Sequence, residues 1–551
     1  MSGSPPAQRL RTDLAMWRRA RRYAVPRRMI ERAAERRLAG DWRGACAAAN
    51  VDVAFDLDGV ADEFGAEAAA RLSDDLRHFA PDLLRWHLPR VGGGRTTIAT
   101  SLVLVLARYE PAGPGGRPLV LNVRTPELVT GSQRLTLALS RRLRDPRLSP
   151  RDWTASRHLF DARHSADLLR HTGGTDRPPF FHPDGTPLTG GELPASAPSS
   201  ASQSALTEWA VLLLERGDLV GAFAAVGLDL RLVDDPKRPW WLRAPDDVIA
   251  NLPVSPVLLA REVARHAAAR PETGVVRIAA DPRSSVRITV GGEGRGRPLA
   301  EVDGERGHDA PPLLDEHRWR RLPDLDLLRA GLVTPEELHP LVRSALFPAR
   351  PGADGPVGPP EGAPPGPVRV RCLGEWHEVR SAGGRLRTPH TARERERENA
   401  MRALGGAVTG CFAVEHAWRT AAGRLPRALR EQRSDLFERA QHGDTEGVLR
   451  LLDAGMDPRV RDGRRRTLLH CLHTLDHEVL LPRLLDAGLD LEDRDHHERT
   501  PLHVAVGDHG TAALCRALVD AGARTDVSDG SDLGLKDLID LRRRTDLTWL
   551  A

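Results

Sequence analysis

Apolar residues in the first two thirds of the chain recur in short runs separated by breaks, a pattern typical of strands mixed with helices. Runs that alternate or stay apolar predict strand pairs across turns rich in Gly and Pro. These pairs are 97–108 with 118–123, 274–280 with 285–290, and the two halves of 368–379. The pattern predicts an α+β fold for this N-terminal region.

Helix signals lie between the predicted strands. A Thr-Pro pair at 125–126 and another at 334–335 each join a capping side chain to a proline at the first helical position, so each predicts a helix start. A capping box spans 334–337, where Glu follows Thr by three residues. Apolar residues at helical spacing predict one long helix from about 392 to 421.

Two segments lack any apolar period and are predicted to be linkers. Residues 189–204 are small and polar, and residues 348–367 are rich in Pro and Gly. The predicted modules are 1–188, 205–347 and 368–432, the last a strand pair plus the long helix, with a different pattern from 433 onward.

The first two modules share an internal echo. Residues 40–48 match 217–225 at a constant offset, and 51–53 match 228–230 at the same offset. Each copy begins with Gly-Asp and continues through an Ala-rich helix into an extended segment. We interpret the Ala and Gly as allowing close helix packing. The echo predicts an internal duplication, with a related α+β module in each half of this region.

The last part of the chain repeats itself at a period of 33 to 34 residues. LLDAG at 451–455 returns as LLDAG at 484–488 and as LVDAG at 518–522. Thr-Leu-Leu-His at 467–470 returns as Thr-Pro-Leu-His at 500–503. Such a period indicates stacked supersecondary units that share one core.

Each repeated residue has a structural role. Thr caps the first helix of a repeat, and Pro501 fits the first helical position. The His satisfies the backbone of a neighbouring loop, and the Gly ends the second helix with a positive φ. In these residues the sequence resembles the ankyrin repeat. The resemblance implies an all-α ankyrin-repeat solenoid at about 433–545, with repeats at 434–466, 467–499 and 500–533 and a C-terminal cap at 534–545.

The loops that connect successive repeats, called fingers, depart from the ankyrin pattern. Where that pattern places Gly, this chain has Arg465 and Glu498. We therefore expect irregular fingers.

The resemblance also implies a function. Ankyrin arrays are binding scaffolds without chemistry of their own, and their partners usually meet finger tips and first helices. The chain is therefore predicted to be a non-catalytic protein–protein interaction protein with an unidentified protein partner. The candidate protein-binding residues are Arg461, Arg464, Arg465, Arg494, His496 and His497.

Composition adds a source and a compartment. Of 80 basic residues, all but Lys237 and Lys536 are Arg, a bias typical of a GC-rich bacterial genome. No apolar run approaches the roughly 20 residues that span a bilayer, so we expect no membrane partner. The first 30 residues have no apolar signal region, and the five Cys are scattered and odd in number. These features predict a cytoplasmic protein with reduced thiols.

Charge is distributed unevenly. Residues 1–43 hold 12 Arg against 4 acidic residues, whereas residues 434–551 hold 16 basic and 23 acidic residues. This asymmetry predicts an intramolecular contact between the basic N-terminus and the array. Trp17 and Tyr23 lie among the Arg residues, so a nucleic-acid binder is an alternative. The genome-wide Arg bias weakens that interpretation, and nucleic acid is not favoured as a partner. In the helix near the N-terminus we expect Ile30, Ala34 and Leu38 to face inward.

A second alternative is an enzyme. Residues 55–60 (FDLDGV) resemble the first motif of haloacid-dehalogenase-type phosphatases, which implies Asp56 as nucleophile, Asp58 as acid/base and Mg²⁺ as cofactor. In the internal echo Asp56 falls on Val233, and Lys237 is the one Lys before position 536. We therefore predict no enzymatic activity, no catalytic residue and no cofactor.

A metal site is also not predicted. Cys471 has His470, His473 and His477 nearby, but no C-x-x-C motif occurs in the sequence. The His residues are explained by the repeats.

Overall fold

The structure is a computed structural model that describes residues 6–110, 117–141, 149–198, 202–232, 243–269, 274–280, 284–290, 297–303, 311–362, 364–406 and 408–550. It combines helices with strands up to residue 387 and is helical beyond. Among the helices in these ranges, none is both long enough and apolar enough to cross a membrane.

The first module is an α+β unit built on a mixed sheet. Its elements are α1 (Pro6–Ala24), α2 (Arg27–Leu38), α3 (Trp42–Ala48), β1 (Val51–Val53), α4 (Val60–Phe64), α5 (Ala66–His78), α6 (Pro81–His87), β2 (Arg90–Gly92), β3 (Arg95–Ile98), β4 (Leu102–Tyr109), β5 (Leu119–Arg124), β6 (Leu135–Ser140), β7 (Ser149–Asp152), η1 (Arg157–Leu159) and η2 (Ala162–Thr172). The five strands of the main sheet have the order β1-β6-β5-β4-β7, and β2 with β3 forms a separate hairpin. The predicted strand pair is β4 with β5, which run antiparallel.

The predicted helix start at residue 125 is wrong. Thr125 instead extends the strand pairing, because its backbone N–H donates to the Leu102 carbonyl and its side chain accepts from the Leu102 N–H. The chain then crosses through an irregular segment to β6.

The second module carries a four-stranded sheet whose order matches the first four strands of the five-stranded sheet, without a counterpart of β7 among the described residues. Its elements are α7 (Gln203–Glu215), α8 (Leu219–Ala224), β8 (Asp229–Arg231), α9 (Pro245–Ala250), α10 (Pro256–Ala269), β9 (Val275–Ala279), β10 (Ser285–Thr289), β11 (Leu299–Asp303), η4 (Glu316–Arg318), α11 (Pro323–Arg329), η5 (Pro335–Glu337) and α12 (Pro340–Leu346). The order is β8-β11-β10-β9, with β8 parallel to β11 and the other pairs antiparallel. In the first sheet β1 is likewise parallel to β6, and β6, β5 and β4 are antiparallel. The hairpin of β9 and β10 is confirmed, and the capping box at 334–337 opens the short turn η5.

The residues of the internal echo form the same local structure in both modules. Asp41 caps α3 by accepting from the Gly44 N–H at 2.8 Å, and Asp218 caps α8 by accepting from the Gly221 N–H at 2.9 Å. A Cβ on Gly44 would lie 2.0 Å from the Asp41 carboxylate, and one on Gly221 would lie 2.2 Å from that of Asp218. These glycines therefore make room for the capping carboxylate, and the matched Ala45 and Ala222 are fully buried, in agreement with our interpretation of close packing.

The two modules share a core at their junction. Leu325, Leu328, Val342 and Phe347 of the second module belong to the same buried cluster as the first sheet. The second sheet has a cluster of its own, which extends from Leu213 to Trp319. Residues from about 322 to 347 therefore pack with the first module, although they follow the second sheet in sequence.

The third part is smaller. It contains β12 (Val368–Cys372), β13 (Glu375–Ala382), β14 (Arg385–Arg387), α13 (Ala392–Ala403) and α14 (Gly410–Thr420). The strand pair is confirmed as β12 with β13, and β14 extends it to three strands. The single long helix is wrong, because the chain breaks after α13 at Gly405, whose φ is +84°. Met401 and Leu404 are exposed rather than packed.

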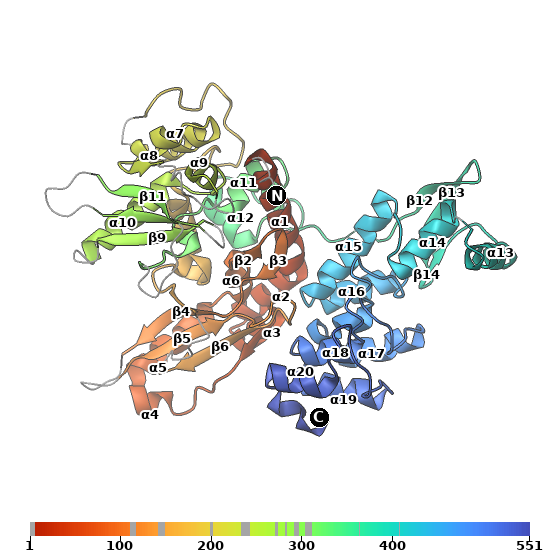
Figure 1. The fold of residues 1–551 in the computed structure, drawn as a ribbon. Coiled ribbons are helices and arrows are strands. Elements are labelled where there is room, and N and C mark those ends of the chain that lie inside the picture. The colour runs from red at the N-terminus through yellow and green to blue at the C-terminus, as the bar shows by residue number, and fades with distance from the viewer. Residues whose placement is uncertain are drawn as a thin grey trace.

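The C-terminal part is a stack of helix pairs. It contains α15 (Arg427–Gln441), α16 (Thr445–Asp453), η6 (Leu468–Thr474), α17 (His477–Asp486), α18 (Pro501–Gly507), α19 (Ala512–Asp520), α20 (Leu535–Arg542) and η7 (Thr545–Leu550). Its core is continuous with that of the third part, since Val379 and Trp418 lie in the same cluster as Leu452 and Leu484. In Figure 1 this stack lies beside the first module, and β12 to β14 lie at its far end.

Candidate protein-interaction site

The repeats are held by the contacts that their sequence predicts. Thr500 caps α18 by accepting from the His503 N–H, and Pro501 occupies the first helical position. Thr467 and His470 form the equivalent cap of η6. Gly455, Gly488 and Gly522 each follow a second helix with a positive φ. These contacts place equivalent residues of successive repeats side by side.

The His of each motif contacts the finger that follows it. His470 Nε2 lies 3.1 Å from the Arg499 carbonyl, and His503 Nε2 lies 3.1 Å from the Val527 carbonyl. Each acceptor lies in the finger that ends the same repeat, so the His satisfies the backbone of a neighbouring loop as expected. Burial lowers the pKa of His470 to about 4, so at neutral pH the ring is uncharged and donates one hydrogen bond.

The fingers are regular, which corrects our expectation. The Asp462 carboxylate accepts from the backbone N–H groups of Arg464 and Arg466, and Asp495 and Asp529 repeat this arrangement. Arg465 and Glu498 adopt the left-handed conformation themselves, with φ of +62° and +57°. The carboxylate contacts hold the turn although glycine is absent.

The six predicted binding residues fall into two groups. Arg461 and Arg494 bridge fingers: Arg461 pairs with Asp493 and donates to the Arg494 carbonyl, and Arg494 donates to the Ser528 carbonyl at 3.0 Å. Both are half-buried. These two guanidiniums act within the array and present little surface to a partner.

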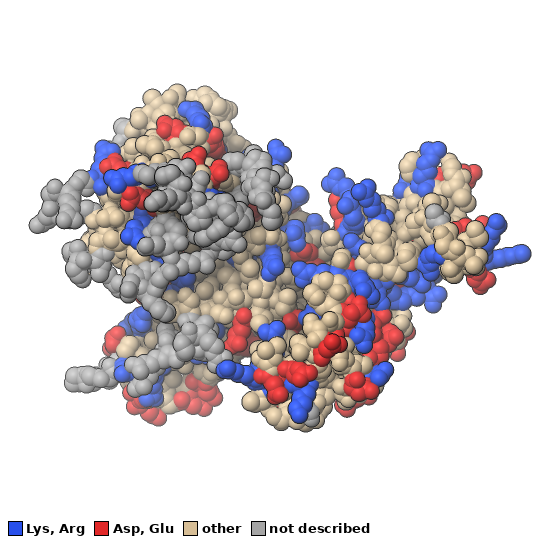
Figure 2. Space-filling model, viewed as in Figure 1, with Lys and Arg blue, Asp and Glu red and all other residues tan. Residues whose placement is uncertain are grey.

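The other four residues form the finger-tip surface, which we define as Arg464, Arg465, His496 and His497. All four are exposed. Arg465 forms an open ion pair with Glu498 at 3.1 Å, and the two His rings lie 3.7 Å apart. The finger-tip surface is therefore basic, on an array that carries acidic side chains over much of its visible face (Figure 2).

The opposite edge of the array, where first and second helices meet, contacts the first module. The basic helices α1 and α2 meet acids of α15 and α16: Arg22 with Asp435 at 3.3 Å, Arg28 with Glu446 at 3.4 Å, and Arg19 with Glu438. This is the contact that the charge asymmetry predicts. We call this edge of the array its base.

Hydrogen bonds continue along the base. His442 Nε2 lies 2.9 Å from Thr96 Oγ1, His473 Nε2 lies 2.9 Å from the Thr130 carbonyl, and Thr130 donates to Asp508 at 2.9 Å. Burial lowers the pKa of His442 and of His473, so both rings are uncharged here. One turn from each repeat thus meets the first module.

A cleft of about 1110 Å³ lies between the base and the first module. Its lining includes Arg28, Arg32 and Arg134, of which the first two pair with Glu446 and the third with Asp52.

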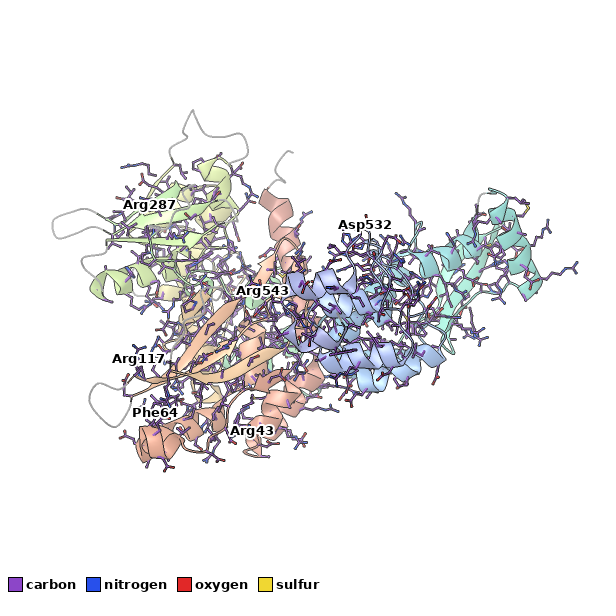
Figure 3. The ribbon with its side chains drawn as sticks, turned by 60° about the horizontal axis from the view of Figure 1, so that its bottom comes forward. Arg43, Phe64, Arg117, Arg287, Asp532 and Arg543 are labelled. Carbon is purple, nitrogen blue, oxygen red and sulfur yellow. The ribbon has the colours of Figure 1, made fainter. Side chains whose placement is uncertain are left out.

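In Figure 3, Arg543 lies on the side of the array nearer the first module, and Asp532 of the third finger lies on the side away from it. The fingers and the base thus face different surroundings.

The N-terminal aromatic residues are not placed for stacking on bases. Trp17 and Tyr23 are buried, and Tyr23 donates to Asp435 at 2.9 Å. Within α2, Ile30 is buried as expected, but Leu38 is 78% exposed and Ala33 takes the inward position instead. Arg residues of these helices form ion pairs with acids of the same chain.

The phosphatase-like motif lies at the margin of the sheet. Asp56 follows β1, an edge strand of three residues, and its side chain is 72% exposed and 3.5 Å from Arg43. Asp58 is exposed as well. The phosphatase chemistry needs these acids at the end of a buried central strand, which this position does not provide. Lys237 and Val233 lie outside the described residues.

The histidines near Cys471 do not gather around it. His470 and His473 are turned to backbone carbonyls of other segments. A different group was missed by the sequence analysis: Cys372, His377, His390 and Cys411 lie together in the third part. Its one sequence signal is Cys372 and His377 on facing strands, because the other two residues are distant along the chain.

Comparison with known proteins agrees with the geometry of the array. A search of curated proteins found no match to this chain. The family model of ankyrin repeats (3 copies) matches residues 436–529. This range begins within α15 and ends in the third finger, so the C-terminal part of the chain is an ankyrin-repeat array, a protein–protein interaction module.

Proposed function

We propose that this chain is a non-catalytic interaction protein that binds a partner protein through the finger-tip surface of its ankyrin array. One observation carries the proposal: the base of the array is covered by the first module, whereas Arg464, Arg465, His496 and His497 are exposed. The first module covers one edge of the array and the third part packs on its N-terminal end, whereas the exposed finger tips are available to a partner.

The chemistry of the finger tips identifies the class of partner. Two guanidiniums and two imidazoles lie on adjacent fingers, and the Arg465 guanidinium pairs with the half-exposed side chain of Glu498. Guanidinium groups bind carboxylates in a planar, paired geometry. The expected partner is a protein with an acidic surface.

The test is capture from extracts of the source cells with the full chain as bait. Arg464→Glu/Arg465→Glu reverses the charge of the finger tips, and we expect it to lose the partner. The control is Arg483→Glu/Arg516→Glu, which makes the same charge change on the second helices α17 and α19. Equal capture by both variants would contradict the proposed surface.

We also infer that the first two modules arose by duplication and that the protein is cytoplasmic and bacterial. The order shared by four strands of each sheet and the matched Asp caps support a duplication. The five cysteines are buried and unpaired, which supports a reducing compartment.

A further inference from the structure

Four side chains meet at the end of the small sheet in the third part. Cys372 ends β12, His377 lies on β13, His390 lies between β14 and α13, and Cys411 lies in the first turn of α14. Their ligand atoms all lie within 4.8 Å of one another. The group therefore draws on four separate segments that converge on one point.

Three of the six separations between the four ligand atoms match a tetrahedron around one ion. His377 Nδ1 lies 3.2 Å from His390 Nε2, His390 Nε2 lies 3.4 Å from Cys372 Sγ, and His377 Nδ1 lies 3.5 Å from Cys411 Sγ. In a tetrahedral zinc site, bonds of about 2.05 Å to N and about 2.3 Å to S give edges of about 3.3 Å between two N atoms and about 3.6 Å between N and S. All three separations fall within about 0.2 Å of these edges.

The outward nitrogen of each imidazole faces a carboxylate. His377 Nε2 lies 3.9 Å from Glu375, and His390 Nδ1 lies 3.9 Å from Glu394. Metal-bound histidines commonly have their second nitrogen directed at a carboxylate, which orients the ring and fixes its tautomer. Both rings thus turn one nitrogen inward and the other toward an acid.

The backbone is shaped to bring the two thiols together. Gly410 has a φ of +59°, and a Cβ there would lie 2.5 Å from Cys372 Sγ. The glycine lets the start of α14 approach the end of β12. Cys372 is 2% exposed and Cys411 is fully buried.

We propose that Cys372, His377, His390 and Cys411 bind one structural Zn²⁺ ion. Binding deprotonates the two thiols, so two protons leave as two thiolate–zinc bonds form, and two neutral imidazoles complete the shell. The thiolates balance the charge of the ion within a buried site. Four protein ligands leave no position for a substrate, so the ion ties α14 to the sheet and has no catalytic role.

The proposal is tested first by metal content. We expect the purified full chain to hold about one zinc ion, as four-ligand structural sites do. Cys372→Ser/Cys411→Ser should lose it, whereas Cys471→Ser/Cys515→Ser, which changes two buried thiols of the array, should keep it. The proposal fails if the wild-type chain takes up no zinc when supplied with it, or if both double variants keep the same content.

A second measurement does not depend on the folding of the double variant. After Co²⁺ replaces the native ion, wild-type protein should show tetrahedral ligand-field absorption and thiolate-to-cobalt charge transfer. His377→Cys keeps four ligands and should retain the ion with stronger charge transfer, because it adds a third thiolate. Absence of charge transfer in the cobalt-loaded wild type, or iron in place of zinc in the purified protein, would each overturn the proposal.

Discussion

The ion pair of Arg21 and Asp324 joins α1 to the helix that follows the second sheet. Its two nitrogen–oxygen contacts measure 2.9 and 2.7 Å, and both side chains are almost fully buried. The Trp86 indole also donates to Asp324. Burial of the guanidinium lowers the pKa of Arg21, and the adjacent Asp324 carboxylate opposes that shift by stabilising the cation.

Asp324→Asn should therefore destabilise the protein strongly. Loss of one member of a buried pair leaves an uncompensated charge, which typically costs about 3–5 kcal/mol. The control is Glu215→Gln, which breaks the exposed pair with Arg329 and should cost less than about 1 kcal/mol. Urea unfolding of each variant measures both values, and equal losses would contradict this ranking.

His470 makes the array sensitive to acid. Its pKa is about 4 in the folded state and about 6.5 in an unfolded chain, so between these pH values the unfolded state binds more protons. Its contribution to stability is complete above pH 6.5 and is lost as pH falls toward 4, by up to about 3 kcal/mol. In His470→Gln this loss should shrink, whereas the exposed His496→Gln should behave as wild type. The measurement is the unfolding free energy of wild type and both variants from pH 7 to pH 4. An equal loss in wild type and His470→Gln would contradict the prediction.

At the scale of elements, the sequence predicts the features that depend on residues close together in the chain. The repeats were recognisable because each Thr cap, Gly stop and His bridge acts within one period. The break after Ala403 and the extended conformation of Thr125 were missed. A short sequence pattern does not show which distant segment will bond to the backbone, as Leu102 does to Thr125. Cys372 and Cys411 were missed for the same reason, since only the folded sheet brings them together.

The matched caps of α3 and α8 give a direct test of equivalence between the two modules. Asp41→Ala and Asp218→Ala each remove one carboxylate from a helix start, so each should destabilise its module by about 1 kcal/mol. Asn at either position keeps an acceptor and should restore most of the loss. Thermal unfolding of the four variants measures this, and an effect in one module alone would count against equivalence.

At the scale of the whole molecule, the array is attached to the rest of the chain by charge. Glu361 of the proline-rich segment also takes part, because it pairs with Arg28 at 3.1 Å and with Arg450 at 2.6 Å. The core runs from β12 into the array, so the unit that docks is the whole of 364–551. Sequence charge indicated the contact, but not that it occupies the base and spares the fingers.

Separate fragments 1–347 and 364–551 should therefore associate in solution. Exposed ion pairs weaken as salt screens them over a Debye length of about 8 Å at physiological ionic strength, so affinity should fall as salt rises. Glu446→Arg opposes Arg28 and Arg32 and should abolish most of the binding, whereas Asp486→Arg on the exposed end of α17 should not. Calorimetric titration that finds no complex at low salt would contradict the docking.

The central claim is that the base of the array contacts the first module while the finger-tip surface binds a partner. Its most direct test places a photo-crosslinking amino acid at either of these two surfaces in the full chain. At position 476, on the base beside the cleft, irradiation should link the array to peptides of the first module near 26–52 or 124–136. At position 497, on the finger-tip surface, irradiation in the source cells should instead yield a covalent adduct with a second protein. Adducts with another protein at 476, or links to the first module at 497, would contradict the account.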